Sequence, residues 1–184
     1  QYIGAITCGA PWLTTTPTTG TLAAGAQQAV TLNINLNAPG TYRANLCFNT
    51  ATGGVPATFS PQNVVPITVT AVAEPLFVGG FVDSRTVRWG ERVVMQARVA
   101  NATLPASTGV VVRADLRQIG GPEGVQLLDN GQNGDTTAGD GIFSAAYTLQ
   151  PRRVPVGLNL VPVRATDNQG RAATDVIELD VRAH

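Results

Sequence analysis

Apolar and polar residues alternate along most of the chain, and this period of two predicts β-strands. Between Val30 and Leu36 every second residue is apolar, and the residues between them are Thr and Asn. The segment Thr41–Phe48 repeats the alternation, with Tyr, Ala, Leu and Phe on one side. No helical period persists over a window of about eleven residues. We therefore expect an all-β fold.

Turn residues divide the rest of the chain into further short segments with the pattern of a β-strand. Pro39–Gly40 and Gly53–Gly54 are such turn signals in the first part of the chain. Short strands separated by Gly, Pro, Asn and Asp loops are typical of antiparallel sandwiches. The further strands that we expect are Tyr2–Thr7, Val64–Val72, Phe77–Val82, Arg92–Ala100, Val110–Leu116, Val125–Leu128, Ile142–Leu149, Leu158–Thr166 and Thr174–Val181.

Charged residues are unevenly distributed, and this predicts two domains. Lys+Arg and Asp+Glu number 12 each, so the formal net charge is +0, and every basic residue is Arg. Arg43 is the only charged residue in 1–73, and all the others lie at or after Glu74. Such a break in composition marks a domain boundary. We expect domains at 1–73 and 76–184, joined at Ala73–Glu74–Pro75, where proline interrupts strand pairing.

The charge balance and the short apolar runs exclude two classes of partner. Without a basic surplus the chain cannot neutralise many phosphates, so we expect no nucleic acid. No apolar run approaches the roughly 20 residues of a membrane span, so we expect no membrane insertion. The neutral Thr, Asn and Gln residues of the first domain leave two interpretations. One is a neutral secreted domain, and the other is a surface that packs against copies of itself, because little like-charge repulsion opposes self-association.

The two cysteines, Cys8 and Cys47, are candidates for a disulfide. Cys8 follows one expected strand and Cys47 lies near the end of another, so a bond between strands is expected. Closing a loop of about 40 residues would contribute roughly 3–4 kcal/mol to stability. The alternative is two buried free thiols. Metal binding by this pair is not expected, because the only histidine is His184. A disulfide would favour an oxidising, extracellular compartment.

One dense polar loop is the candidate metal site. It carries the carboxylates of Asp129, Asp135 and Asp140 and the amides of Asn130 and Asn133, with glycines between them. Calcium takes about six to eight oxygen ligands, and a loop of this kind can fold back to supply them. The loop is not an EF-hand, because no Glu closes it and no helices flank it. The alternative interpretation is turn chemistry, since Asn, Asp and Gly form long hairpin loops.

Catalytic residues are missing from the sequence. A Ser–His–Asp or Cys–His arrangement needs an internal histidine as base, and His184 is the last residue of the sequence. We therefore expect no enzyme and no catalytic or cofactor-binding residue. The aromatic residues are scattered along the chain, and Trp12, Tyr42, Phe143 and Tyr147 lie at positions expected for a core. We expect Trp89 in the core or at the domain junction rather than on a sugar-binding platform. Thr14–Thr19 and Asn101 are candidate glycan acceptors.

Short motifs in both domains resemble known families. Those of the first domain resemble the Ig-like repeats of bacterial secreted and surface multidomain proteins. They are Trp12–Leu13, Thr16–Thr21, Ala24–Gly25 and Pro39–Tyr42. The second domain is similar to another Ig-like module, found in C-terminal regions of secreted bacterial proteins that include hydrolases. Its motifs are Asp129–Gly131, Gly134–Asp135 and Ala138–Ser144. The resemblance implies two tandem antiparallel Ig-like (fibronectin III-like) β-sandwiches and says little about activity.

The first domain is short for such a sandwich, with about 73 residues against the usual 100 or so. A sandwich that lacks its N-terminal strands exposes an apolar groove and unpaired backbone groups. In a polymer, a strand donated by the next subunit would fill that groove. A cut end, or a smaller sandwich that closes by itself, would also account for the short length. We expect a non-catalytic extracellular structural protein, a filament subunit that binds copies of itself. The alternative is a spacer region of a secreted hydrolase.

Overall fold

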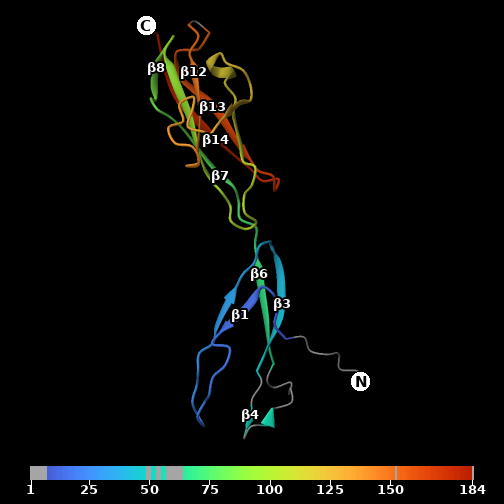
Figure 1. Ribbon diagram of the computed structural model, residues 1–184. Helices are drawn as coiled ribbons and strands as arrows, with labels where there is room; N and C mark the ends of the chain where they lie inside the picture. Colours follow the sequence, from blue (N-terminus) through green and yellow to red (C-terminus); the bar gives the residue numbers. More distant parts are fainter. Residues whose placement is uncertain (1–7, 49–50, 53–54, 57–63, 152, 184) are drawn as a thin grey trace, which may run out of the picture. The chain divides into compact units, whose positions relative to one another are not determined.

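The computed structural model describes residues 8–48, 51–52, 55–56, 64–151 and 153–183 (Figure 1). These residues form an all-β structure without an α-helix, as the alternation predicted, and their one helical turn is the 3-10 helix η2, Arg117–Ile119. The chain separates into two compact units, Gln1–Ala73 and Glu74–His184. The predicted strand Tyr2–Thr7 lies outside the described residues.

Unit 1 consists of antiparallel ribbons of two strands each. β1 (Leu13–Thr16) pairs with β2 (Thr31–Ile34), and β3 (Gly40–Cys47) pairs with β6 (Val64–Ala71). A third, very short ribbon joins β4 (Ala51–Thr52) to β5 (Val55–Pro56). The predicted strands at β2, β3 and β6 are confirmed. β2 and β6 are shorter than their predicted segments, and β3 begins and ends one residue earlier than Thr41–Phe48.

Strand β1 was not predicted from the sequence. Its Thr14-Thr15-Thr16 run shows no alternation of apolar and polar residues, so the period-two signal is lost. Threonine is nevertheless a strong strand former, because its branched β-carbon fits a pleated surface. The pairing with β2 extends from Leu13↔Ile34 to Thr16↔Thr31, and Pro17 ends the strand.

Few side chains of unit 1 are buried. Leu13, 6% exposed, is the only fully buried hydrophobic residue among those that the structure describes in this unit. Trp12 and Tyr42 meet edge to face, with ring centroids 5.7 Å apart and an interplanar angle of 64°. Larger apolar side chains such as Ile34 and Val65 are 46% and 45% exposed. The two main ribbons of unit 1 therefore have little common core.

Unit 2 contains two sheets. The first has five strands in the order β11-β10-β13-β14-β8, and the second has three in the order β12-β9-β7. All neighbouring strands are antiparallel except β14 and β8, which are parallel. The strands are β7 (Phe77–Val82), β8 (Thr86–Arg88), β9 (Arg92–Ala100), β10 (Val111–Ala114), β11 (Val125–Leu127), β12 (Ile142–Thr148), β13 (Gly157–Thr166) and β14 (Ala172–Arg182).

The two sheets of unit 2 share one hydrophobic core. Met95 of β9, Val163 of β13 and Ile177 of β14 lie in the same cluster, and each is at most 1% exposed. Gly80 lies inside β7 because a β-carbon there would come within 2.6 Å of Ile177 Cγ1. Trp89 packs against this core and donates a hydrogen bond from Nε1 to Val154 O at 3.0 Å.

An ion pair between Asp167 and Arg171 fixes one end of unit 2. The Asp167 side chain is fully buried and lies 2.7 Å from Arg171 Nη2. Arg171 also donates to Pro105 O and Ser107 Oγ, which ties the loop after β9 to the turn between β13 and β14. Burial raises the pKa of the Asp167 carboxyl, but the hydrogen bonds from Arg171 and Ser107 outweigh it, so this pKa lies below its usual value.

Candidate functional site

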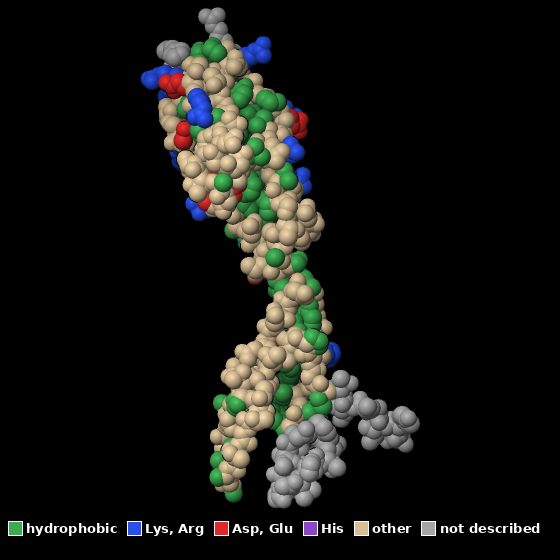
Figure 2. Space-filling view, viewed as in Figure 1, with side chains coloured by type: hydrophobic (Ala, Val, Ile, Leu, Met, Phe, Trp, Pro, Cys, Tyr) green, Lys and Arg blue, Asp and Glu red, His purple; other side chains and the backbone are tan. Residues whose placement is uncertain are grey.

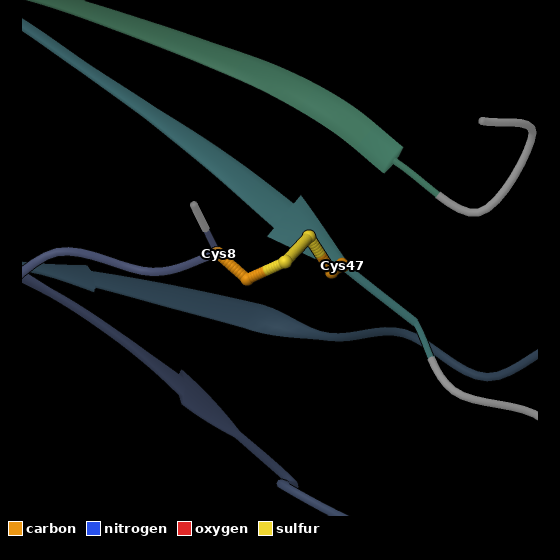
Figure 3. Close-up of a disulfide and its surroundings, with 2 residues drawn as sticks. All are labelled: Cys8 and Cys47. Carbon is orange, nitrogen blue, oxygen red and sulfur yellow. A yellow bond between two sulfur atoms is a disulfide. The ribbon is translucent and has the colours of Figure 1, made fainter. Parts of the chain in front are cut away.

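Cys8 and Cys47 form a disulfide, with a Cα–Cα distance of 5.7 Å (Figure 3). The described residues contain no free cysteine, so the alternative of two buried thiols is wrong. Gly9 N donates to Asn45 O at 2.8 Å beside the bond, so the chain at Cys8 and Gly9 lies along the side of β3 that faces away from β6. The disulfide indicates a non-reducing environment.

The polar loop before β12 brings together three of the predicted metal ligands. Carboxylate oxygens of Asp129, Asp135 and Asp140 all lie within 4.8 Å of one another. Calcium–oxygen distances are about 2.3–2.6 Å, so two ligands on opposite sides of one ion are separated by roughly 5 Å. The spacing of the three carboxylates therefore fits a single cation. Asn130 and Asn133 lie in the same loop, and Asn130 Oδ1 accepts a hydrogen bond from Gln132 N.

Backbone amides also hold these carboxylates. Asp129 accepts hydrogen bonds from the N–H groups of Gly139, Asp140 and Gly141, at 2.6, 3.2 and 3.0 Å. Asp135 accepts from Gly131 N, and this bond is the main cause that keeps the pKa of its carboxyl below the usual value. These bonds are the turn chemistry that was the alternative to calcium. They fix the loop by themselves, so calcium binding stays a prediction.

The same loop packs against the three-stranded sheet. Gly134 has a φ of +100°, and a β-carbon there would lie 2.5 Å from Val94 Cγ1. Ser144, in the strand that follows the loop, is 1% exposed, and its hydroxyl has no hydrogen-bond partner in the described part of the chain. None of the described residues is a histidine, so Ser144 has no imidazole base among them.

Two exposed aromatic residues were not recognised from the sequence. Phe77 and Phe81 of β7 are 61% and 37% exposed, and they lie on the face of β7 opposite to the core-facing Gly80. Phe81 also lines a shallow hollow of about 240 Å³ together with Arg85 and Glu178. The spacing of four residues between the phenylalanines was the available signal, because it places both on one face of a strand.

One face of the β3–β6 ribbon of unit 1 is apolar and only partly buried, and hydrophobic side chains show at the surface of this unit in Figure 2. Side chains directly opposite in an antiparallel pair lie on the same face. This face is formed by Tyr42, Ala44, Leu46, Val65, Ile67, Val69 and Ala71. None of these side chains is fully buried, and Val65 is 45% exposed. A hollow of about 420 Å³ is lined by Gly9, residues 43–45 and residues 66–68.

The outer edge of β6 has no hydrogen-bonded neighbour among the described residues. The carbonyl of Asn45 accepts a hydrogen bond from Gly9 N and therefore points away from β6. Asn45 and its partner Pro66 are thus a non-hydrogen-bonded pair of the β3–β6 ladder. Because the pattern alternates, Thr68 and Thr70 also direct their N–H and C=O groups outward. In unit 2, by contrast, side chains accept hydrogen bonds from strand N–H groups: Asp175 accepts from Gly80 N, and Gln118 accepts from Leu160 N.

The candidate glycan acceptors lie at the surface. Thr14 and Thr16 of β1 are exposed, and Thr15 is half-buried. Asn101 is exposed, and the hydroxyl of Thr103 donates to Glu74 Oε2 at 2.7 Å.

No protein-family model matches the chain, and a search of curated proteins finds no match. Within the described residues, no helix is long and apolar enough to cross a membrane.

Proposed function

We propose that this protein is a non-catalytic, extracellular structural subunit whose copies join into a filament by adding a β-strand to one another. Unit 1 would accept the strand of a neighbouring copy, and unit 2 would fold independently as the body of the subunit. In this proposal both units are Ig-like sandwiches, and the first lacks strand material that a neighbour provides.

The observation that carries the proposal is the poor burial of unit 1. One hydrophobic side chain is fully buried among its described residues, whereas the core of unit 2 includes Met95, Leu127, Ile177 and many others. Fully burying one aliphatic side chain stabilises a fold by roughly 1.5–3 kcal/mol. A strand added beside β6 would cover apolar surface that is now partly exposed, that of Val65 above all, so strand addition would favour assembly.

The charge distribution supports self-association of unit 1. Arg43 is its single charged residue, so two copies of this unit meet with almost no like-charge repulsion. Natural proteins commonly protect open strand edges with charged side chains or prolines. The outer edge of β6 has one such protection, Pro66, and retains the outward N–H groups of Thr68 and Thr70. The Cys8–Cys47 disulfide is consistent with an extracellular location.

Electron microscopy of the untagged 184-residue protein, combined with light scattering, tests this function. Long uniform fibres that resist dilution are the expected result. A stable monomer of 19.1 kDa at all concentrations would overturn the filament and leave the spacer region of a secreted hydrolase as the alternative.

A further inference from the structure

We infer that the outer edge of β6 is the acceptor site and that its occupant is the segment Gln1–Thr7 of a second copy. The inference rests on the proposed function and adds to it the two surfaces that meet. Strand addition to an open edge takes its affinity from main-chain hydrogen bonds and its register from alternate side chains. The main-chain groups and the alternate side chains of the β6 edge can therefore be compared with those of the segment Gln1–Thr7.

The acceptor edge offers a regular set of groups. Thr68 and Thr70 present outward N–H and C=O groups, and Pro66 presents its C=O. The side chains of Val65, Ile67 and Val69 on the neighbouring apolar face are partly exposed, and none is charged. An added strand would extend this face by one row, and its own apolar side chains would pack beside Ile67 and Val69.

The segment Gln1–Thr7 has the matching chemistry. It carries no charged side chain, and both of its alternate rows contain apolar residues, with Tyr2 and Ile6 in one row and Ile3 and Ala5 in the other. An uncharged segment loses no ion hydration when an uncharged edge covers it. Seven residues in extended form would span about 23 Å, which is close to the length of the eight-residue strand β6.

The disulfide holds Cys8, the residue that follows this segment, far from the outer edge of β6 in the same copy. Cys8 is bonded to Cys47 on the side of β3 that faces away from β6. A strand added to the outer edge of β6 lies three strand spacings from that side, or about 14 Å. Crossing that distance would use about four extended residues, so residues 1–7 of the same copy are too few to reach β6 and also cover it.

Donor and acceptor are different surfaces of one subunit, so donation from each copy to the next in one direction is a heterologous contact. A heterologous contact that does not close into a ring produces an open filament. One-directional donation agrees with the proposed function, whereas pairing of β6 with β6, or a reciprocal exchange between two copies, would stop at a dimer.

Two variants of the whole protein separate the donor from the acceptor. Deletion of residues 1–7 removes the donor and leaves the edge intact. Thr68→Pro removes one outward N–H group and leaves the ladder to β3 intact, as Pro66 already does at the preceding outward position. Thr68→Ala is the matched control, since it keeps the N–H group. Each of the first two variants alone is expected to remain a monomer, whereas Thr68→Ala should assemble like the unchanged protein.

Mixing the two variants is the decisive step. The deletion variant can only accept and the Thr68→Pro variant can only donate, so their mixture should stop at a one-to-one pair of about twice the monomer mass. Emission of Trp12 checks that unit 1 is folded in each variant. If the deletion unfolds unit 1, Ile6→Asp in the whole chain replaces it. Assembly of the Thr68→Pro variant by itself would overturn the inference. A mixture that stays monomeric although both proteins are folded would also overturn it.

A synthetic peptide with the sequence of Gln1–Thr7 separates failure of this inference from failure of the filament. The deletion variant should bind the peptide, and the same protein carrying Thr68→Pro should bind it at least tenfold more weakly. Peptide binding by a protein whose complete form stays monomeric would uphold the acceptor site and reject the filament. Fibres that form equally well without residues 1–7 would uphold the filament and reject this donor.

Discussion

Removal of the disulfide should strongly destabilise unit 1 and leave the stability of unit 2 unchanged. The double variant Cys8→Ala/Cys47→Ala opens a loop with a sequence separation of 39. In the loop-entropy model this costs about 4 kcal/mol. A unit of this length has an ordinary net stability of about 4–11 kcal/mol, and unit 1 buries far less apolar surface than usual. The loss of the disulfide therefore removes a large share of its stability.

The two tryptophans allow each unit to be followed separately, because Trp12 lies in unit 1 and Trp89 in unit 2. Urea unfolding is measured by fluorescence in a Trp89→Phe background for unit 1 and in a Trp12→Phe background for unit 2. With a denaturant slope of about 2 kcal/mol per molar, the Trp12 midpoint should fall by about 2 M. The Trp89 midpoint should not move.

A matched control perturbs unit 2 instead. Ile177 is fully buried, so Ile177→Ala should cost about 2–5 kcal/mol in the Trp89 transition and nothing in the Trp12 transition. The reasoning is refuted if the Trp12 midpoint is unchanged without the disulfide, because unit 1 would then have a source of stability that its burial does not account for.

Three further predictions concern unit 2. Gly80→Ala should destabilise it by about 1–3 kcal/mol in chemical denaturation, because the added methyl overlaps Ile177, whereas Gly79→Ala meets open space and should be close to neutral. Equal effects would contradict this packing argument. If the carboxylate loop binds calcium, millimolar calcium should raise the melting temperature of the protein but not that of Asp129→Asn, and the absence of any shift would reject the site. The folded-state pKa of Asp167 lies below its unfolded value of about 3.9, so its contribution to stability is present at neutral pH and lost as the pH falls below about 4. The free energy of unfolding of unit 2, followed by Trp89 fluorescence, should therefore fall less steeply at acid pH in Asp167→Asn than in the unchanged protein. An equal fall in both proteins would count against this role.

Much of the strand content could be predicted from the sequence, because burial of one face imposes a period of two. Phe77–Val82 and Arg92–Ala100 coincide with β7 and β9. The prediction over Val110–Leu116 was too long, because β10 ends at Ala114 and Leu116 N donates to Pro122 O in a turn. Strand β8 (Thr86–Arg88) was missed, since a strand of three residues with one apolar side chain, Val87, carries too little alternation to be recognised.

The candidate site could be predicted only in part. The convergence of Asp129, Asp135 and Asp140 followed from their spacing in a glycine-rich loop. The amide donors that hold these carboxylates could not be inferred, because they depend on the turn conformations of residues 131–141. The outer edge of β6, which has no strand neighbour among the described residues, also required the structure, since it depends on which side of β3 Cys8 and Gly9 occupy.

Hydrogen exchange at single amides in β6 tests the central claim most directly. Thr68 and Thr70 direct their N–H groups to the open edge, whereas Ile67 and Val69 belong to the hydrogen-bonded pairs with β3. The exchange rates are compared between dilute protein and concentrated, assembled protein. The account predicts that the Thr68 and Thr70 amides exchange fast when dilute and become protected on assembly, while the Ile67 and Val69 amides are protected in both states. Outer amides that exchange equally fast in both states, or that are already protected in the dilute protein, would contradict it.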